Sequence, residues 1–259
     1  MSSLRACLKL VQVAAIYAFL APVQIVSRSL GLKLSRKLPV FAHRAVIRTL
    51  GIRIATSGEI PGRKPTLVVS NHVSWLDIIV VGSLHPISFI AKAEVQKWPV
   101  FGTLARLQDS IFIDRQRRKA TAEANATIAR RLSEGDAVVL FAEGTTGDGT
   151  YLLPFRSSLI GAAHAALAHD AENGADHIDI KPLAIAYTRR NGLPITRRDR
   201  PKIAWYGDME LFPHLWAFLR EGPLDVAICW GESLPLCPDM DRKAITASIQ
   251  NTVQRNLYR

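Results

Sequence analysis

Short apolar runs that alternate with helical patterns restrict the fold of this chain more than any other feature. The alternation begins after Gly58, and this order of runs is typical of α/β domains. Most runs are largely apolar and do not alternate between apolar and polar residues, which indicates strands buried on both faces of a sheet. We therefore predict an α/β fold with a mostly parallel central sheet flanked by helices. The predicted strands are Thr66–Ser70, Ile87–Ala91, Ser110–Ile113, Ala137–Phe141, Ile180–Tyr187, Lys202–Tyr206 and Val226–Trp230.

Helical patterns fill the segments between and after these runs. The clearest, Lys119–Glu134, places Ala124, Ile128 and Leu132 four residues apart and stops at Gly135. Two more helices and one basic loop complete the prediction, namely Ser158–His169, Asp241–Leu257 and the loop Thr188–Pro201.

The first 58 residues are both basic and apolar. They hold nine Lys and Arg and no acidic residue, so they carry +9 of the net charge of +11. The 18 uncharged residues from Leu10 to Ser27 would extend about 27 Å as a helix, only just the thickness of a bilayer's hydrocarbon core. Gln12, Pro22 and Gln24 interrupt them. We predict that residues 1–58 form a membrane-associated helical segment that lies in the interface, with a single span as the alternative, and that residues 59–259 form the main domain.

The stretch from Val68 to Asp77, VVSNHVSWLD, places His72 just after a predicted strand and Asp77 five residues later. A carboxylate can fix the tautomer of an imidazole and stabilise its protonated form, which makes the pair a candidate general base. A second interpretation is structural, because Ser74 and Asp77 have the spacing of a capping box and could serve a helix N-terminus.

Two other strands are predicted to end in polar groups. Asp109–Arg118 ends a strand with Asp114 and Arg115, where a guanidinium could hold a phosphate. Leu140–Gly149 ends a strand with Glu143 and then three glycines, a loop that lets backbone N–H groups approach a ligand. In parallel sheets ligands bind beyond the carboxyl ends of the strands, so these groups are expected at one site.

These motifs together resemble the glycerolipid acyltransferase family, whose best-known members are the 1-acyl-sn-glycerol-3-phosphate acyltransferases. The chain has His-x4-Asp, then a strand ending Phe-Ile-Asp-Arg, then Phe-x-Glu-Gly-Thr, then an apolar strand led by Pro182, in the family's order. The resemblance covers about Ile54 to Thr188. The basic apolar N-terminal segment also fits, because family members dock on membranes through such helices.

The resemblance implies that His72 is a general base for an acceptor hydroxyl and that Asp77 orients it. The acyl group would come from acyl-CoA or acyl-carrier protein as co-substrate, with no other cofactor and no metal. The main expectation is transfer to 1-acyl-sn-glycerol-3-phosphate (lysophosphatidic acid), which gives phosphatidic acid. No G-x-S-x-G elbow occurs in the sequence, which favours direct transfer over an acyl-enzyme. The residues expected to hold the acceptor are Arg115, Glu143, Gly144 and Thr145.

The third motif departs from the family pattern. Phosphate-using members commonly read Phe-Pro-Glu-Gly-Thr-Arg, whereas this chain has Ala142 in place of Pro and Thr146 in place of Arg. Either Arg156 supplies the lost positive charge, or the acceptor's head group is not a phosphate monoester. The second possibility keeps another lysolipid, such as lyso-ornithine lipid, open as the acceptor.

Partners of other classes are less well supported by the sequence. The basic clusters Arg115–Lys119 and Arg197–Arg200 contain no interleaved aromatic residues, so no nucleic-acid partner is expected. No H-E-x-x-H motif occurs, and the three cysteines form no C-x-x-C, which fits a reducing setting at the cytoplasmic face of a membrane. A non-catalytic membrane-surface binding protein remains the alternative from another class.

Overall fold

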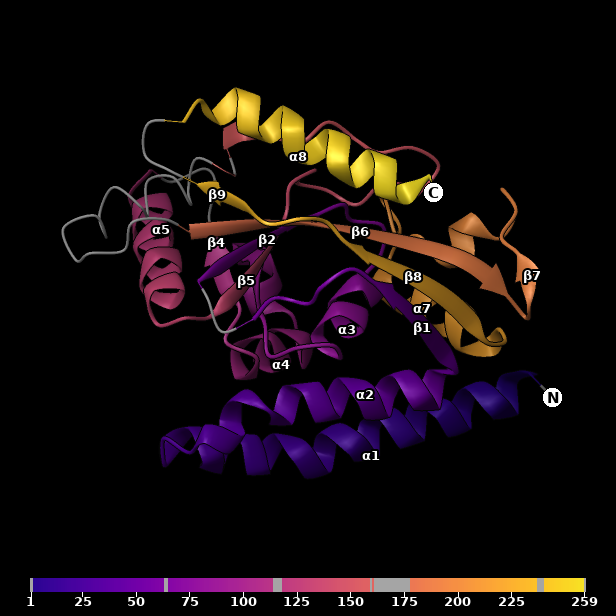
Figure 1. The fold of residues 1–259 in the computed structure, drawn as a ribbon. Helices are drawn as coiled ribbons and strands as arrows, with labels where there is room; N and C mark the ends of the chain where they lie inside the picture. Colours follow the sequence, from indigo (N-terminus) through magenta and orange to yellow (C-terminus); the bar gives the residue numbers. More distant parts are fainter. Residues whose placement is uncertain are drawn as a thin grey trace.

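The computed structural model describes residues 2–62, 65–113, 118–158, 160, 178–236 and 240–258. Within them the chain forms a nine-stranded sheet in the order β1-β8-β6-β2-β5-β3-β4, with β7 and β9 paired to β6. Helices cover both faces of the sheet (Figure 1). The strands are β1 Ile52–Ser57, β2 Thr66–Ser70, β3 Ser88–Lys92, β4 Ile111–Ile113, β5 Ala137–Phe141, β6 Ile178–Arg190, β7 Leu193–Pro194, β8 Leu224–Trp230 and β9 Leu234–Leu236.

The centre of the sheet is parallel. Strand β2 pairs in parallel with both β5 and β6, and β3 pairs in parallel with β5 and β4. The direction reverses between β6 and β8, which are antiparallel, and β1 then runs parallel to β8. The predicted mostly parallel α/β sheet is therefore confirmed. Strands β2 and β5 end level with each other, at Ser70 and Phe141, beside Leu183 of the longer strand β6. The polar motifs that follow β2 and β5 therefore lie at one edge, as expected.

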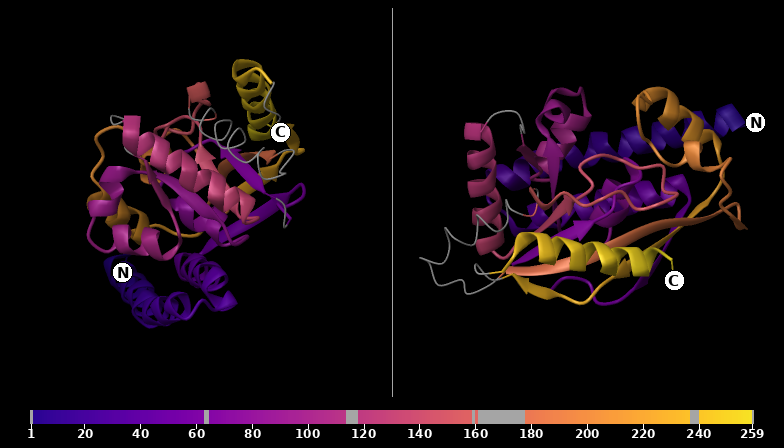
Figure 2. Two further views of the ribbon diagram at one scale, coloured as in Figure 1. Left: turned by 90° about the vertical axis from the view of Figure 1, so that its left-hand side faces the viewer. Right: turned by 90° about the horizontal axis from the view of Figure 1, so that it is seen from above.

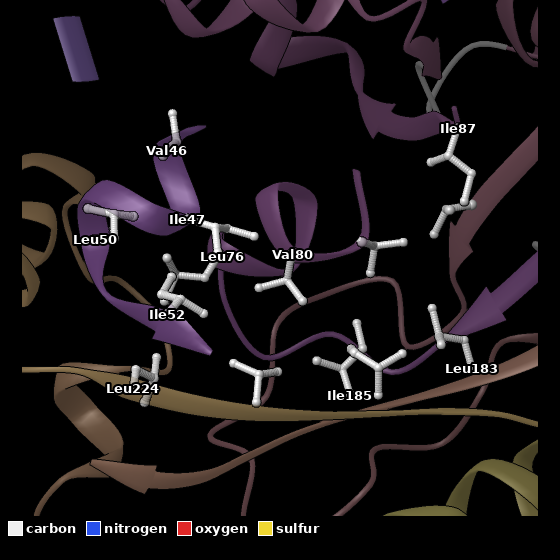
Figure 3. Close-up of a cluster of buried hydrophobic side chains, with 14 of the residues drawn as sticks. Val46, Ile47, Leu50, Ile52, Leu76, Val80, Ile87, Leu183, Ile185 and Leu224 are labelled. Atoms are coloured by element: carbon white, nitrogen blue, oxygen red, sulfur yellow. The ribbon is translucent and has the colours of Figure 1, made fainter. Parts of the chain in front are cut away.

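Each central strand buries side chains on both faces. In β2, Val68 packs in one apolar cluster while Leu67 and Val69 pack in the other. Helices α2, α3 and α7 contribute to the first cluster, part of which appears in Figure 3, and α5 and α8 contribute to the second. The helices are α1 Ser2–Ser29, α2 Leu38–Leu50, α3 Leu76–Gly82, α4 Phe101–Leu107, α5 Arg118–Ser133, α7 Leu211–Arg220 and α8 Arg242–Leu257, with 3₁₀ turns η1 Lys33–Arg36, η2 Ala93–Lys97 and η4 Arg200–Lys202.

Helices α1 and α2 lie side by side on the opposite side of the sheet from α8 (Figures 1 and 2). Helix α1 is fastened near both ends. The Lys9 ammonium donates to the carbonyl oxygens of Leu50 and Glu221, at 3.4 and 3.2 Å. Near the other end, Gln24 donates to the carbonyl oxygen of Leu107 at 2.8 Å. Helix α1 therefore rests along the domain instead of extending away from it.

The outer side of α1 is apolar and exposed. Residues Ser3–Ser29 contain a window with a mean hydropathy of 1.8, so by length and composition alone this helix could cross a membrane. Only 11% of that window is buried. The exposed large apolar side chains of α1 are Leu4, Leu8, Leu10, Val11, Phe19, Ile25 and Val26.

The segment Lys202–Tyr206 is not a strand, and that prediction is wrong. Its first residue closes η4, and the N–H groups of Ile203 and Ala204 both donate to the carbonyl oxygen of Arg200. The run is apolar because Ile203 and Ala204 are buried. The Trp205 N–H donates to the carbonyl oxygen of Val73 at 2.9 Å, but the segment pairs with no strand of the described sheet. A short apolar run without a clear periodicity can be a buried turn as well as a buried strand, and the sequence alone does not distinguish the two.

Other boundaries also differ from the predictions. The expected loop Thr188–Pro201 begins as strand, because β6 continues to Arg190 and turns through Asn191 and Gly192, both at positive φ, to pair with β7. Such a turn is typical of a two-residue hairpin. The sheet also starts before residue 58, since β1 lies in the segment assigned to the N-terminal helical part. The predicted helix Ser158–His169 falls mostly outside the described residues.

Candidate active site

The loop after β2 is fixed by an asparagine. The Asn71 side chain accepts a hydrogen bond from the N–H of Ile185 at 2.8 Å and donates one to the carbonyl oxygen of the same residue at 3.0 Å. The amide thus continues the pairing of β2 with β6 one residue past the end of the strand. The backbone is therefore held in place at Asn71, directly before His72.

His72 and Asp77 form a hydrogen-bonded pair. The distance from Nδ1 of His72 to Oδ2 of Asp77 is 2.8 Å. The same oxygen accepts the N–H groups of Val73 and Ser74 at 2.7 and 3.0 Å. Asp77 therefore accepts backbone donors just before α3 and holds the imidazole at the same time. The capping interpretation is correct for the Asp77 carboxylate but not for the Ser74 hydroxyl, which has no hydrogen-bond partner among the described residues. The role of His72 as a general base stays a prediction. A carboxylate partner requires hydrogen on Nδ1, which leaves the lone pair on Nε2.

Buried groups hold the pair from two further sides. The His72 ring stacks on Phe141, the last residue of β5, with ring centroids 3.9 Å apart. The Tyr187 hydroxyl, on β6, donates to Oδ1 of Asp77 at 2.6 Å. Burial and the neighbouring Asp77 charge raise the pKa of Tyr187 well above its ordinary value. Tyr187 is therefore a hydrogen-bond donor across the physiological pH range.

Glu143 supports the backbone of the histidine loop. Its carboxylate accepts the N–H of His72 at 2.8 Å and that of Leu153 at 3.2 Å. Burial raises the pKa of Glu143 to about 7, and the Asp77 charge adds to the effect, while the two backbone hydrogen bonds oppose it. The N–H of Gly147 donates to the carbonyl oxygen of His72 at 2.8 Å, so the glycine loop contacts the same residue from the other side.

His72 lines a cleft with a volume of about 210 Å³ at the carboxyl ends of the strands. The cleft wall mixes charged, aromatic and apolar groups. Side chains that line it include Asp148, Tyr151, Leu152, Tyr187, Ile195, Arg200, Ile203, Leu257 and Tyr258. Within the described ranges, no group of three His, Cys, Asp or Glu side chains could hold a metal ion. A mixed polar and apolar wall suits an acceptor with a polar head and an acyl chain.

The structure brings together only some of the predicted site residues. His72 and Glu143 line the cleft, and Asp77 is buried behind His72. Gly144 is half-buried, and the exposed Thr145 and Arg156 are not part of the cleft wall. Arg115, the remaining acceptor-binding prediction, lies outside the described residues.

Four residues of the site were missed from the sequence, namely Asn71, Asp148, Tyr187 and Arg200. Asn71 and Tyr187 did carry a signal, because each is a polar residue at the end of an apolar strand. Arg200 carried none, since its loop reads as a solvent-exposed basic segment.

Comparisons with known proteins find relatives that match most of this chain. The family model described as Acyltransferase matches residues 51–186. A lyso-ornithine lipid O-acyltransferase of Brucella abortus is 45% identical over 97% of this chain and 93% of its own length. A 1-acyl-sn-glycerol-3-phosphate acyltransferase of Neisseria meningitidis is 29% identical over 82% of this chain and 77% of its own length.

A solved structure shares the fold. The 1-acyl-sn-glycerophosphate acyltransferase PlsC of Thermotoga maritima superposes with a TM-score of 0.69 at 20% identity, over 99% of this chain and 96% of its own. The family model covers more than half of the chain, and the Brucella relative matches almost all of it. The chain therefore belongs to the acyltransferase family and is an O-acyltransferase of lysolipids.

Proposed function

We propose that this enzyme transfers an acyl group to the hydroxyl of lyso-ornithine lipid, with His72 as the general base. The observation that carries the mechanism is the 2.8 Å contact between Nδ1 of His72 and Oδ2 of Asp77, on a histidine that lines the cleft. The choice of acceptor is supported by the 45% identity to a lyso-ornithine lipid O-acyltransferase. It is also supported by Thr146, which stands where phosphate-using members commonly have Arg.

The reaction needs one base and no covalent enzyme intermediate. Nε2 of His72 takes the proton of the acceptor hydroxyl as its oxygen attacks the thioester carbonyl of acyl-CoA or acyl-carrier protein. The C–S bond then breaks, an ester is formed, and the leaving thiolate takes the proton from His72. Asp77 stabilises the imidazolium that exists between these steps. A positioned base contributes about 10²- to 10⁴-fold, so alignment of donor and acceptor supplies much of the remaining acceleration.

The enzyme would work at the cytoplasmic face of a membrane. The exposed apolar side of α1 and the nine basic residues of the first 58 fit an anionic bilayer surface. Because α1 is fastened to the domain near both ends, we infer that it lies in the interface and does not span the bilayer. Cys7 and Cys229 are free thiols, as is common in a reducing compartment.

An acyl-transfer assay tests the acceptor and the base together. Purified wild type and His72→Ala would receive labelled acyl-CoA or acyl-carrier protein with either lyso-ornithine lipid or lysophosphatidic acid. We expect product from lyso-ornithine lipid with the wild type, and a loss of at least a hundredfold in the variant. Preferential use of lysophosphatidic acid would overturn the acceptor. Unchanged turnover by a folded His72→Ala variant would overturn the role of His72.

A further inference from the structure

We infer that Asp148 and Arg200 bind the two opposite charges of the ornithine head group, the ammonium and the carboxylate respectively. The inference rests on the proposed function and adds to it the residues that select the acceptor. Both side chains line the cleft that contains His72.

Asp148 is held next to His72 by the two glycines that flank it. On one side, the N–H of Gly147 donates to the carbonyl oxygen of His72 at 2.8 Å. On the other side, Gly149 has a φ of +73°, and a Cβ added there would lie 3.1 Å from a methyl carbon of Val73. The loop therefore contacts two successive residues of the histidine loop, and Asp148 sits between these contacts. A larger residue at position 149 would strain the backbone and press on Val73.

Arg200 contacts the same loop. One of its terminal nitrogens, Nη1, donates to the carbonyl oxygen of Gly149. This bond uses one of the five N–H groups of the guanidinium, and no carboxylate within the described part of the chain forms an ion pair with Arg200. The remaining N–H groups can donate hydrogen bonds to a planar carboxylate of a ligand.

The Asp148 carboxylate also keeps unused acceptor capacity. Its two oxygens accept the N–H and the hydroxyl of Thr150, at 2.8 and 2.9 Å. Each carboxylate oxygen has a second lone pair, and the side chain is half-exposed to the cleft. An ammonium group of a ligand can therefore bind without breaking the turn that positions the aspartate.

The charges fit a zwitterion better than a phosphate monoester. Ornithine joined through its α-amino group keeps one carboxylate and one ammonium, which match one guanidinium and one carboxylate. A phosphate monoester carries up to two negative charges and would face Asp148 with only Arg200 to offset the repulsion among the described lining residues. Asp148 is thus both an attractive contact for the ornithine ammonium and a repulsive one for lysophosphatidic acid.

Chemically altered acceptors test each charge separately. We would measure kcat/KM for lyso-ornithine lipid, for its δ-N-acetyl derivative without the ammonium, and for its carboxyl methyl ester without the carboxylate. Asp148→Asn should lower kcat/KM for the natural acceptor about tenfold and change it little for the N-acetyl derivative. Arg200→Gln should show the same pattern with the methyl ester. Asp148→Asn should also narrow the preference for lyso-ornithine lipid over lysophosphatidic acid.

Matched variants separate recognition from folding and from general charge effects. Asn at 148 can keep both hydrogen bonds of Thr150, so the loop should be retained. The controls are Asp208→Asn and Arg198→Gln, which remove the same charges from exposed residues outside the cleft wall. The inference would be overturned if Asp148→Asn lowered kcat/KM equally for the natural acceptor and the N-acetyl derivative, or if Arg200→Gln did so for the natural acceptor and the methyl ester. If the wild type does not acylate lyso-ornithine lipid, the proposed function itself is overturned. This outcome differs from the one that overturns the inference alone.

Discussion

The Tyr187 hydroxyl donates a hydrogen bond of 2.6 Å to Oδ1 of Asp77, while Oδ2 of the same carboxylate lies 2.8 Å from Nδ1 of His72. Asp77 is fully buried, so both of its oxygens depend on protein donors. Tyr187 withdraws part of the negative charge that would otherwise act on the imidazole. It is a positioning residue, because it acts through Asp77.

Replacement of Tyr187 by Phe should weaken catalysis and shift its pH dependence. Without the hydroxyl, Oδ1 of Asp77 is left unsatisfied and the carboxylate attracts the imidazolium more strongly. A base must be neutral to act, so the acid limb of the kcat/KM profile should move to higher pH. At neutral pH we expect a loss of roughly tenfold. The measurement is kcat/KM from pH 5 to 9 in wild type and variant.

A second tyrosine provides the control for this experiment. Tyr17→Phe removes a hydroxyl from a half-buried tyrosine in α1, outside the cleft wall, and should leave the profile unchanged. If Tyr187→Phe lowers the rate by the same factor at every pH, the hydroxyl only supports the structure.

His72→Ala and Asp77→Asn should have similar effects on activity and different effects on stability. Asp77 accepts four hydrogen bonds in a fully buried position, and the amide of Asn would turn a donor toward some of those donors. We expect a cost of about 2–4 kcal/mol in the free energy of unfolding. His72 is half-buried at the cleft, and its replacement should cost about 1–2 kcal/mol.

Denaturant unfolding and acyl transfer on the same preparations test this contrast. Activity should fall about 10²- to 10⁴-fold in each single variant, and the double variant should be little worse than either, because the two residues act as a unit. Losses that multiply in the double variant would show that the residues act independently.

Glu143 should make the protein less stable as the pH rises. Its pKa in the folded protein, about 7, lies above the ordinary value of 4.5 because burial disfavours the charged form. A raised carboxyl pKa gives stability that is complete below pH 4.5 and is lost as the pH passes through about 7. The loss approaches about 3 kcal/mol at most.

Glu143→Gln removes this titration. The free energy of unfolding of the wild type, measured at intervals from pH 4.5 to pH 8, should decline relative to that of the variant. Gln keeps the acceptor for the N–H of His72 but faces the N–H of Leu153 with a donor, so the variant should be less stable at pH 4.5. If the free energies of unfolding of the two proteins run parallel from pH 4.5 to pH 8, the pKa of Glu143 in the folded protein lies at or below the lower end of this range.

The His72–Asp77 pair could be predicted because its geometry is local. The two residues flank one turn between a strand and a helix, and the spacing alone brings an imidazole and a carboxylate to the same helix start. The central strands were equally predictable, since β2 and β5 are largely apolar and are buried at every position. The pair depends on residues that are near each other in sequence, and the strands depend on burial, which their apolar composition indicates.

The supporting residues could not be predicted in the same way, because their contacts join distant segments. Tyr187 meets Asp77 across 110 positions, and Arg200 meets Gly149 across 51. No periodicity encodes such a contact. Glu143 was predicted to hold the acceptor, yet its carboxylate accepts backbone hydrogen bonds from His72 and Leu153, which only the folded loop reveals.

Membrane binding should depend on the exposed apolar side of α1. Phe19 has 74% of its surface exposed, so Phe19→Glu should not disturb packing but should remove apolar area and add a negative charge. We expect at least a tenfold weaker partition onto vesicles of anionic phospholipid, measured by flotation.

Gln12→Glu is the control, because it adds the same charge at an exposed polar position of the same helix. If the two variants bind equally, charge alone governs attachment and the apolar side of α1 is not inserted. If only Phe19→Glu is released, the helix lies with this side in the lipid.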